Sequence, residues 1–210
     1  MSDFTTWRSL VDGEEIGVIP DSVVLPEEND LDNFDGDTSV FEIVSGRQVT
    51  GDFSLEGTPS FADNIRSQSG LNRYPEPGEK FACYLQEIDN DAGVLAMFGV
   101  QDASNFYGFG FRDDELVIHK DGFSVSDNIG GEEQVSGLSD GEWFDLEVEW
   151  QSDGTITLSV FEIDQNSGDR QNLLGDVSAT DTDYSSGGVG FGSSSGGSIA
   201  LNNYRVTEVL

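Results

Sequence analysis

From about residue 41 to residue 209 the sequence is a succession of short runs in which apolar and polar residues alternate. Each run has the length of a β-strand, and glycine, asparagine, aspartate or serine residues separate it from the next. Such strands bury their apolar sides only when two sheets pack face to face, so the sequence predicts an all-β, antiparallel two-sheet sandwich. The predicted strands lie within residues 41–45, 49–57, 61–69, 80–88, 93–102, 106–114, 115–120, 143–150, 155–163, 170–179, 187–193 and 198–209.

The runs at 143–150 and 155–163 show this pattern most clearly. The intervening "QSDG" ends in an Asp-Gly pair, which accepts the positive φ of a tight hairpin turn. Alternate side chains of a strand share one face, which divides the first run into an apolar set and a polar set. The polar set consists of Trp143, Asp145, Glu147 and Glu149.

These three carboxylates raise the question of glycoside hydrolysis. Neighbours on one strand face lie about 6.5–7 Å apart, within the separation of about 5–9.5 Å that glycosidases use between two carboxyl groups. Such enzymes also need an apolar pocket that raises the pKa of one acid. Because the acids here share a polar face, we expect them to be solvated. The sequence favours a protein without catalytic residues, with a hydrolase as the alternative.

The charge of the chain is extreme and spread over its whole length. Its 41 acidic residues against 9 basic ones give a net charge of −32. Phosphate backbones need lysine and arginine, so nucleic acid is excluded as a partner. A surface rich in acids and poor in lysine is typical of proteins that work in molar salt, where a Debye length of about 3 Å screens self-repulsion. We therefore expect a halophilic source.

Targeting and redox features are sparse. Cys83 is the only cysteine, so an internal disulfide is ruled out and a buried thiol is expected. No run approaches the roughly 20 apolar residues of a membrane span, and the amino terminus lacks the basic and apolar segments of a signal peptide. We expect no membrane insertion, and cytoplasmic synthesis without a signal peptide.

Residues 1–34 differ from the rest of the chain. Their short apolar patches are broken by glycine and proline, as in "EEIGVIPDSVVLPEEND". We interpret this segment either as an N-terminal arm that docks on a partner or as a lead-in that packs on its own domain. Residues 35–210 are predicted to form the sandwich.

Three stretches resemble the concanavalin A-like lectin/glucanase sandwiches, particularly their laminin-G-like branch. They are "LAMFGVQDASNFYGFGFR" at 95–112, "GEWFDLEVEWQSDGTITLSVFE" at 141–162 and "GGVGFGSSSGGSIALNNYRV" at 187–206. The resemblance implies a jelly-roll sandwich that binds carbohydrate. Laminarinase-type hydrolases of this superfamily use Glu-x-Asp-x-x-Glu, whereas this chain has Asp-x-Glu-x-Glu. That departure favours a lectin-like protein over an enzyme.

The opening stretch "TTWRSLVDGEEIGVIPDS" at 5–22 is similar to the start of virion proteins in tailed viruses of halophilic archaea. This resemblance implies a turret, tail-fibre or decoration module on a virion or extracellular surface, present as a homo-oligomer or a multi-copy array. The expected partners are host-surface carbohydrate or glycoprotein, and other virion proteins that contact the arm. A purely structural capsid or tail decoration protein is the alternative.

Four residues are predicted to bind carbohydrate. Trp143 heads the polar strand face, where an exposed ring would stack on the apolar side of a sugar. A tryptophan that caps the core is the alternative for this residue. Tyr107 is the second expected ring, and Asn105 and Arg112 are the expected polar partners in "NFYGFGFR", whose glycines permit close approach.

No cofactor is required by the sequence, although calcium stays open as a ligand. Zinc lacks support because His119 is the only histidine. Laminin-G-like domains, which the chain resembles, often bind calcium through oxygen ligands. The turn acids that could supply such ligands are Asp89 with Asp91, Asp102, and Asp181 with Asp183.

Overall fold

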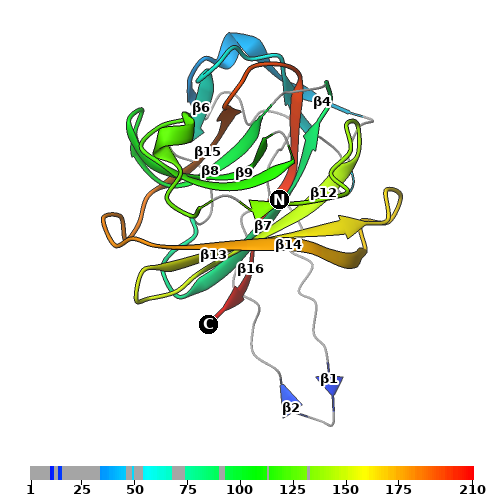
Figure 1. Ribbon diagram of the computed structural model, residues 1–210. Coiled ribbons are helices and arrows are strands. Elements are labelled where there is room, and N and C mark those ends of the chain that lie inside the picture. The colour runs from blue at the N-terminus through cyan, green and yellow to red at the C-terminus, as the bar shows by residue number, and fades with distance from the viewer. Residues whose placement is uncertain are drawn as a thin grey trace, which may run out of the picture.

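The computed structural model describes residues 10–11, 14–15, 34–45, 49, 54–67, 74–89, 93–112, 114–131 and 133–210. Two antiparallel sheets of seven strands each pack face to face (Figure 1). The predicted all-β sandwich is confirmed, and each of the predicted runs contains a strand. Apart from the short pair β1 (Leu10–Val11) and β2 (Glu14–Glu15), the predicted arm at 1–34 lies outside the described residues until Phe34.

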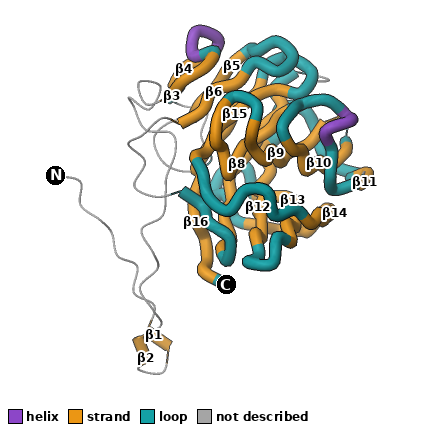
Figure 2. The backbone as a smooth tube through the Cα atoms, turned by 90° about the vertical axis from the view of Figure 1, so that its left-hand side faces the viewer, coloured by secondary structure: helices purple, strands orange, loops and turns teal. Residues whose placement is uncertain are grey.

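The first sheet, here sheet I, is antiparallel throughout. In spatial order it consists of β11 (Glu133–Gln134), β10 (Glu115–Lys120), β9 (Asn105–Arg112), β8 (Val94–Asp102), β15 (Gly188–Ser193), β6 (Asn64–Ser67) and β3 (Phe34–Gly36). Figure 2 shows β6, β15, β8, β9 and β10 following one another across this sheet. The neighbours β8 and β15 are far apart in the sequence, so the sheet joins distant segments.

The second sheet, sheet II, is also antiparallel. Its spatial order is β14 (Arg170–Thr180), β13 (Thr155–Ile163), β12 (Trp143–Trp150), β7 (Glu79–Glu87), β16 (Ile199–Val209), β5 (Ser54–Gly57) and β4 (Phe41–Val44). The predicted hairpin joins β12 to β13, and Gly154 has the positive φ, +88°, that its turn requires.

The core lies between the sheets and is rich in aromatic rings. The predicted apolar face of β12 is confirmed, since none of its four side chains is more than 1% exposed. The two aromatic rings of this face, Phe144 and Trp150, meet rings of β8 and β9 edge to face. Phe98 and Trp150, for example, have 4.9 Å between ring centroids. Cys83 is buried with a free thiol, as predicted. Burial of each large side chain stabilises the fold by about 1.5–3 kcal/mol.

The outer face of sheet I is covered by the segment that connects β10 to β11 and contains the short 3-10 helix η3 (Val125–Asp127). Phe123 of this segment packs on Phe106 of β9. His119 is fully buried on the same face, with Nδ1 3.3 Å from the Gly122 carbonyl oxygen. Its Nε2 has no hydrogen-bond partner within the described part of the chain. Burial lowers the pKa of His119 because a charged imidazole would be poorly solvated there.

A second 3-10 helix, η2 (Thr38–Val40), precedes β4. Among the described residues, no helix is long and apolar enough to cross a membrane.

Candidate functional site

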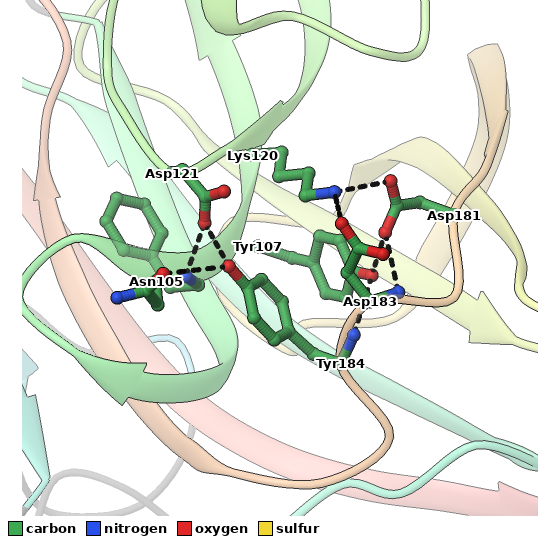
Figure 3. Close-up of polar contacts among 8 residues, drawn as sticks. Asn105, Tyr107, Lys120, Asp121, Asp181, Asp183 and Tyr184 are labelled. Carbon is green, nitrogen blue, oxygen red and sulfur yellow. Dashed lines mark hydrogen bonds and ion pairs between the residues drawn. The ribbon is translucent and has the colours of Figure 1, made fainter.

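Polar and aromatic side chains from three segments meet at one end of the sandwich (Figure 3). The segments are the start of β9, the end of β10 with the following turn, and the connection from β14 to β15. Folding thus joins residues up to 79 positions apart in the sequence. We name this group the Tyr184 cluster; it consists of Asn105, Tyr107, Lys120, Asp121, Asp181, Asp183 and Tyr184.

A tight turn between β8 and β9 positions Asn105. The Asp102 carboxylate accepts hydrogen bonds from the Ser104 backbone N–H (2.7 Å) and from Asn105 Nδ2 (2.8 Å). Such aspartate bonds stabilise short turns. The hydrogen bond from Ser104 holds the pKa of Asp102 below its ordinary value, and the bond from Asn105 adds a smaller effect in the same direction. Asn105 is therefore held in one orientation before any ligand arrives.

Two glycines let the 181–187 connection lie directly against β8. Gly99 has φ +59°, and the pairing of β8 with β9 is irregular beyond it. A Cβ atom on Gly187 would lie only 2.4 Å from the Gly99 carbonyl carbon, and one on Gly99 would lie 3.3 Å from Tyr107 Cδ2. Side chains at these positions would push the connection outward, so the glycines allow Tyr184 to contact Tyr107.

Tyr107 forms the buried base of the cluster. Its ring meets Trp150 edge to face at 6.0 Å, and its hydroxyl donates to Asp181 Oδ1 at 2.5 Å. The same hydroxyl oxygen accepts a bond from the Tyr184 backbone N–H at 3.3 Å. Burial and the bond to Asp181 raise the pKa of Tyr107, so its hydroxyl stays protonated and acts as a donor.

An ion-pair group lies beside Tyr107. Lys120 Nζ donates to Asp181 Oδ2 at 2.7 Å and also contacts Asp183. Burial opposes the ionisation of Lys120, but its bonds to the two carboxylates outweigh this effect and raise its pKa. Burial also opposes the ionisation of Asp181, yet the bonds from Lys120 and Tyr107 hold its pKa below the ordinary value. The Lys120 ammonium and the Asp181 carboxylate therefore both stay charged near neutral pH.

Tyr184 is the partly exposed ring of the cluster. The ring meets that of Tyr107 edge to face, with 5.0 Å between ring centroids. The Lys120 ammonium lies 5.9 Å from the centroid of the Tyr184 ring. Its hydroxyl donates to Asp121 Oδ1 at 2.5 Å and lies 3.3 Å from Asn105 Oδ1. Burial and the bond to Asp121 raise the pKa of Tyr184 to about 12. The hydroxyl of Tyr184 is therefore held by Asp121, and its ring is held by the contact with Tyr107.

This arrangement combines a fixed aromatic surface with charged and polar groups around it. Asp121 and Asp183 are exposed, and their carboxylate oxygens can accept hydrogen bonds from a ligand. An aromatic ring with such neighbours is suited to a ligand that has an apolar face and several hydroxyl groups.

The structure brings two of the four predicted sugar-binding residues together. Asn105 and Tyr107 belong to the cluster, whereas Arg112 lies at the other end of β9 and Trp143 lies on the outer face of sheet II. The expectation of exposed rings is wrong for both aromatic residues, because Tyr107 is 0% and Trp143 is 5% exposed. Trp143 instead packs with Tyr84 and other apolar residues in a small cluster on that face.

Sequence reasoning missed Tyr184, Lys120 and Asp121. Tyr184 lies in "DTDYSSGG", where only the acids were predicted ligands, and Lys120 and Asp121 form the turn that ends β10. The available signal was a tyrosine in a polar connection between two strands, because functional side chains are often placed on such connections.

The turn acids proposed for calcium are otherwise engaged. Lys120 occupies the space between Asp181 and Asp183, Asp102 stabilises its own turn, and Asp89 accepts a bond from Ser198. Asp91 lies outside the described residues. Within the described ranges, no group of three or more His, Cys, Asp or Glu side chains is arranged to hold a metal ion.

The carboxylates of β12 were predicted to be solvated, and this prediction is wrong. Asp145 is 1% exposed and accepts a 2.6 Å bond from Arg170 Nε and bonds of 3.0 and 3.2 Å from Arg205 Nη2. Glu147 accepts a 2.9 Å bond from Arg170, and Glu149 lies 3.5 Å from the Lys80 ammonium. The prediction of an open polar face is therefore wrong here, because neighbouring strands supply cations.

The two arginines of this group also lie against aromatic rings. The guanidinium of Arg170 is 4.3 Å from the Phe161 ring centroid, and that of Arg205 is 4.7 Å from the Tyr84 centroid. Guanidinium groups stack well on such rings. Carboxylates that are held by guanidinium groups lack the apolar pocket of a glycosidase acid.

A groove of about 470 Å³ lies elsewhere, along β4 and β5. Glu42 and Glu56 are directly opposed on these strands and both line it. Thr58, Ser198 and the partly buried Ile88 also contribute to the lining.

No protein-family model and no curated protein matches the sequence of this chain. Solved structures match its fold. The carbohydrate binding module CBM66 from Bacillus subtilis has a TM-score of 0.57 at 14% identity, covering 83% of this chain and 96% of the module. A candidate glycosyl hydrolase from Parabacteroides distasonis has a TM-score of 0.53 at 10% identity, covering 86% of this chain and 95% of that one.

The binding domain of Paraclostridial mosquitocidal protein 1 is similar as well. Its TM-score is 0.53 at 13% identity, over 90% of this chain but only 48% of that domain. At such low identities the likeness shows the fold alone. This chain therefore has a β-sandwich fold that is also found in a carbohydrate-binding module.

Proposed function

We propose that this chain is a non-enzymatic, lectin-like module that binds carbohydrate at the Tyr184 cluster. The observation that carries the proposal is the partly exposed Tyr184 ring, which is fixed by Asp121 and Tyr107 and lies beside two exposed carboxylates, those of Asp121 and Asp183. A sugar would stack its apolar face on the ring and donate its hydroxyls to those carboxylates. The similarity of the fold to CBM66 from Bacillus subtilis supports this function.

The state of the β12 acids opposes catalysis. Asp145 and Glu147 are both held by Arg170, so neither is available as a general acid in an apolar pocket. A hydrolase is accordingly the less favoured function.

We further propose that the module belongs to a virion or surface appendage and binds host-surface glycans in high salt. This part rests on the net charge of −32 and on the similarity of residues 5–22 to haloarchaeal virion proteins. Single-site affinity is expected to be weak. Repeated copies in a homo-oligomer or array would raise the overall affinity by about 10²–10⁴ through effective concentration. Other virion proteins would then be partners of the N-terminal arm.

A glycan array in about 3 M salt tests the proposal, with the parent chain displayed in many copies. Stacking on an aromatic ring contributes about 0.5–1.5 kcal/mol beyond area burial. Tyr184→Ala should therefore weaken binding by about threefold to tenfold. Phe61→Ala is the matched control, because it removes a 54% exposed ring from the turn before β6.

Equal binding by the parent and Tyr184→Ala, both folded, would place the site elsewhere. A parent chain that binds no glycan would favour a structural decoration protein. Release of sugar from host glycoprotein would instead support the hydrolase.

A further inference from the structure

We propose that the Tyr184 cluster selects uncharged sugars and amino sugars, and rejects sugars that carry a carboxylate or sulfate group. This inference rests on the proposed function. It concerns which ligand charge the site accepts, and the side chains of the cluster determine this preference.

Carboxylates outnumber cations in the cluster. Asp121, Asp181 and Asp183 belong to it, and Lys120 is the only cation that forms ion pairs with them among the described residues. Asp102, bonded to Asn105, adds a fourth carboxylate next to the cluster. Arg66 acts on Asp102 electrostatically but is only the weakest of the influences on that carboxylate.

The single cation is not available to an anionic ligand. Lys120 contacts both Asp181 and Asp183, and its side chain is only 18% exposed. A sugar carboxylate could reach the ammonium only by displacing one of these bonds. It would exchange one carboxylate for another at that position while its charge is repelled by those that remain.

The carboxylates that face solvent are the groups that an approaching sugar meets. The side chain of Asp183 is 66% exposed, and Asp121 is also exposed. Asp121 Oδ1 already accepts bonds from the Tyr184 hydroxyl and the Phe106 backbone N–H, which leaves Oδ2 as an acceptor. Sugar hydroxyls can donate to these oxygens, and an ammonium group adds a charge-assisted bond. A sulfate or carboxylate has no proton to donate and meets like charge.

The test measures the affinity for three immobilised oligosaccharides that differ only at one residue, which is a neutral hexose, an amino hexose or a hexuronate. Binding is compared in about 0.5 M and about 3 M salt. At the lower salt the parent should bind the neutral and amino forms at least about fivefold more tightly than the hexuronate form. The ratio should shrink at the higher salt because the Debye length falls below about 3 Å.

Asp183→Asn and Asp121→Asn should each raise the relative affinity for the hexuronate form. Asp140→Asn is the matched control, since it removes the same charge from an exposed position. Asp140 precedes β12 at its Trp143 end, whereas the cluster contacts Trp150 at the other end, about 25 Å away along the strand. The control should leave the ratio as it is in the parent.

Tighter binding of the hexuronate than of the neutral form would overturn the inference and leave carbohydrate binding intact. An equal shift of the ratio by Asp140→Asn would also overturn it, because the discrimination would then come from the net charge of the whole chain. If a folded parent bound no sugar in either salt, the proposed function itself would fail.

Discussion

Substitution of Asp145 by alanine should destabilise the fold strongly. The Asp145 side chain is 2% exposed and holds two guanidinium groups, those of Arg170 and Arg205. Removing one partner from a buried ion pair costs about 3–5 kcal/mol, because the remaining charge is left without compensation. The two arginine side chains are 32% and 19% exposed, so water can solvate them in part. We therefore expect the lower end of that range, about 3 kcal/mol.

Thermal unfolding followed by circular dichroism measures this loss. In a chain of this length, 1 kcal/mol corresponds to about 2–4 °C, so Asp145→Ala should lower the melting temperature by about 6–12 °C. Glu147→Gln is the control, because Glu147 is 20% exposed and Arg170 keeps Asp145 as a partner. That control should cost at most about 1 kcal/mol.

The dependence on salt distinguishes the buried ion pairs of Asp145 from ion pairs at the surface. Screening acts mainly on exposed charges, so the loss in Asp145→Ala should persist in about 3 M salt. A loss below about 1 kcal/mol, or one that disappears in high salt, would show that Asp145 is a solvated surface acid.

Two further predictions concern stability. The melting temperature of the parent should rise between about 0.1 and 3 M salt, because the Debye length falls from about 10 Å to below 3 Å and screens the repulsion of −32 charges; a flat curve would contradict this. Burial lowers the pKa of His119 and Arg112 lowers it further, while the Gly122 carbonyl and Asp127 raise it; the net lowering means that protonation of His119 destabilises the fold. In molar salt, stability should be complete above pH 6.5, the ordinary value, and should decrease as the pH falls toward the lower pKa of the folded state. This decrease should be smaller in His119→Gln, and an equal decrease in both proteins would rule His119 out as its source.

The strands were predictable because alternation is a local property. Each run that was long enough to show a period of two residues contains a strand. Within the two seven-stranded sheets, the strands that were missed are β3 and β11, which have three and two residues and are too short to show alternation. Pairing with long neighbours in sheet I defines them, and that information is not local.

The error at Tyr107 could have been avoided from the sequence. Tyr107 is in phase with Phe109 and Phe111, which all lie on the buried side of β9. Alternation therefore places the Tyr107 ring in the core together with the two phenylalanines. Its hydroxyl and one side of its ring contact the Tyr184 cluster.

The partners of Asp145 could not be predicted in the same way. Arg170 and Arg205 lie 25 and 60 residues away, and the order of the strands in sheet II brings them to one carboxylate. The Tyr184 cluster depends on the same kind of long-range arrangement, since Tyr184 meets Asp121 across 63 positions. Sequence patterns gave the type of each side chain, whereas sheet order determined which of them meet.

The central claim is tested most directly by backbone amide chemical shifts. They are recorded while a glycan that binds on the array is titrated into the protein in high salt. If the Tyr184 cluster is the carbohydrate site, the changes should concentrate at residues 105–107, 120–121 and 181–185 and should saturate together. Changes that concentrate at the groove lined by Glu42 and Glu56, or on the outer face of sheet II around Trp143, would contradict it.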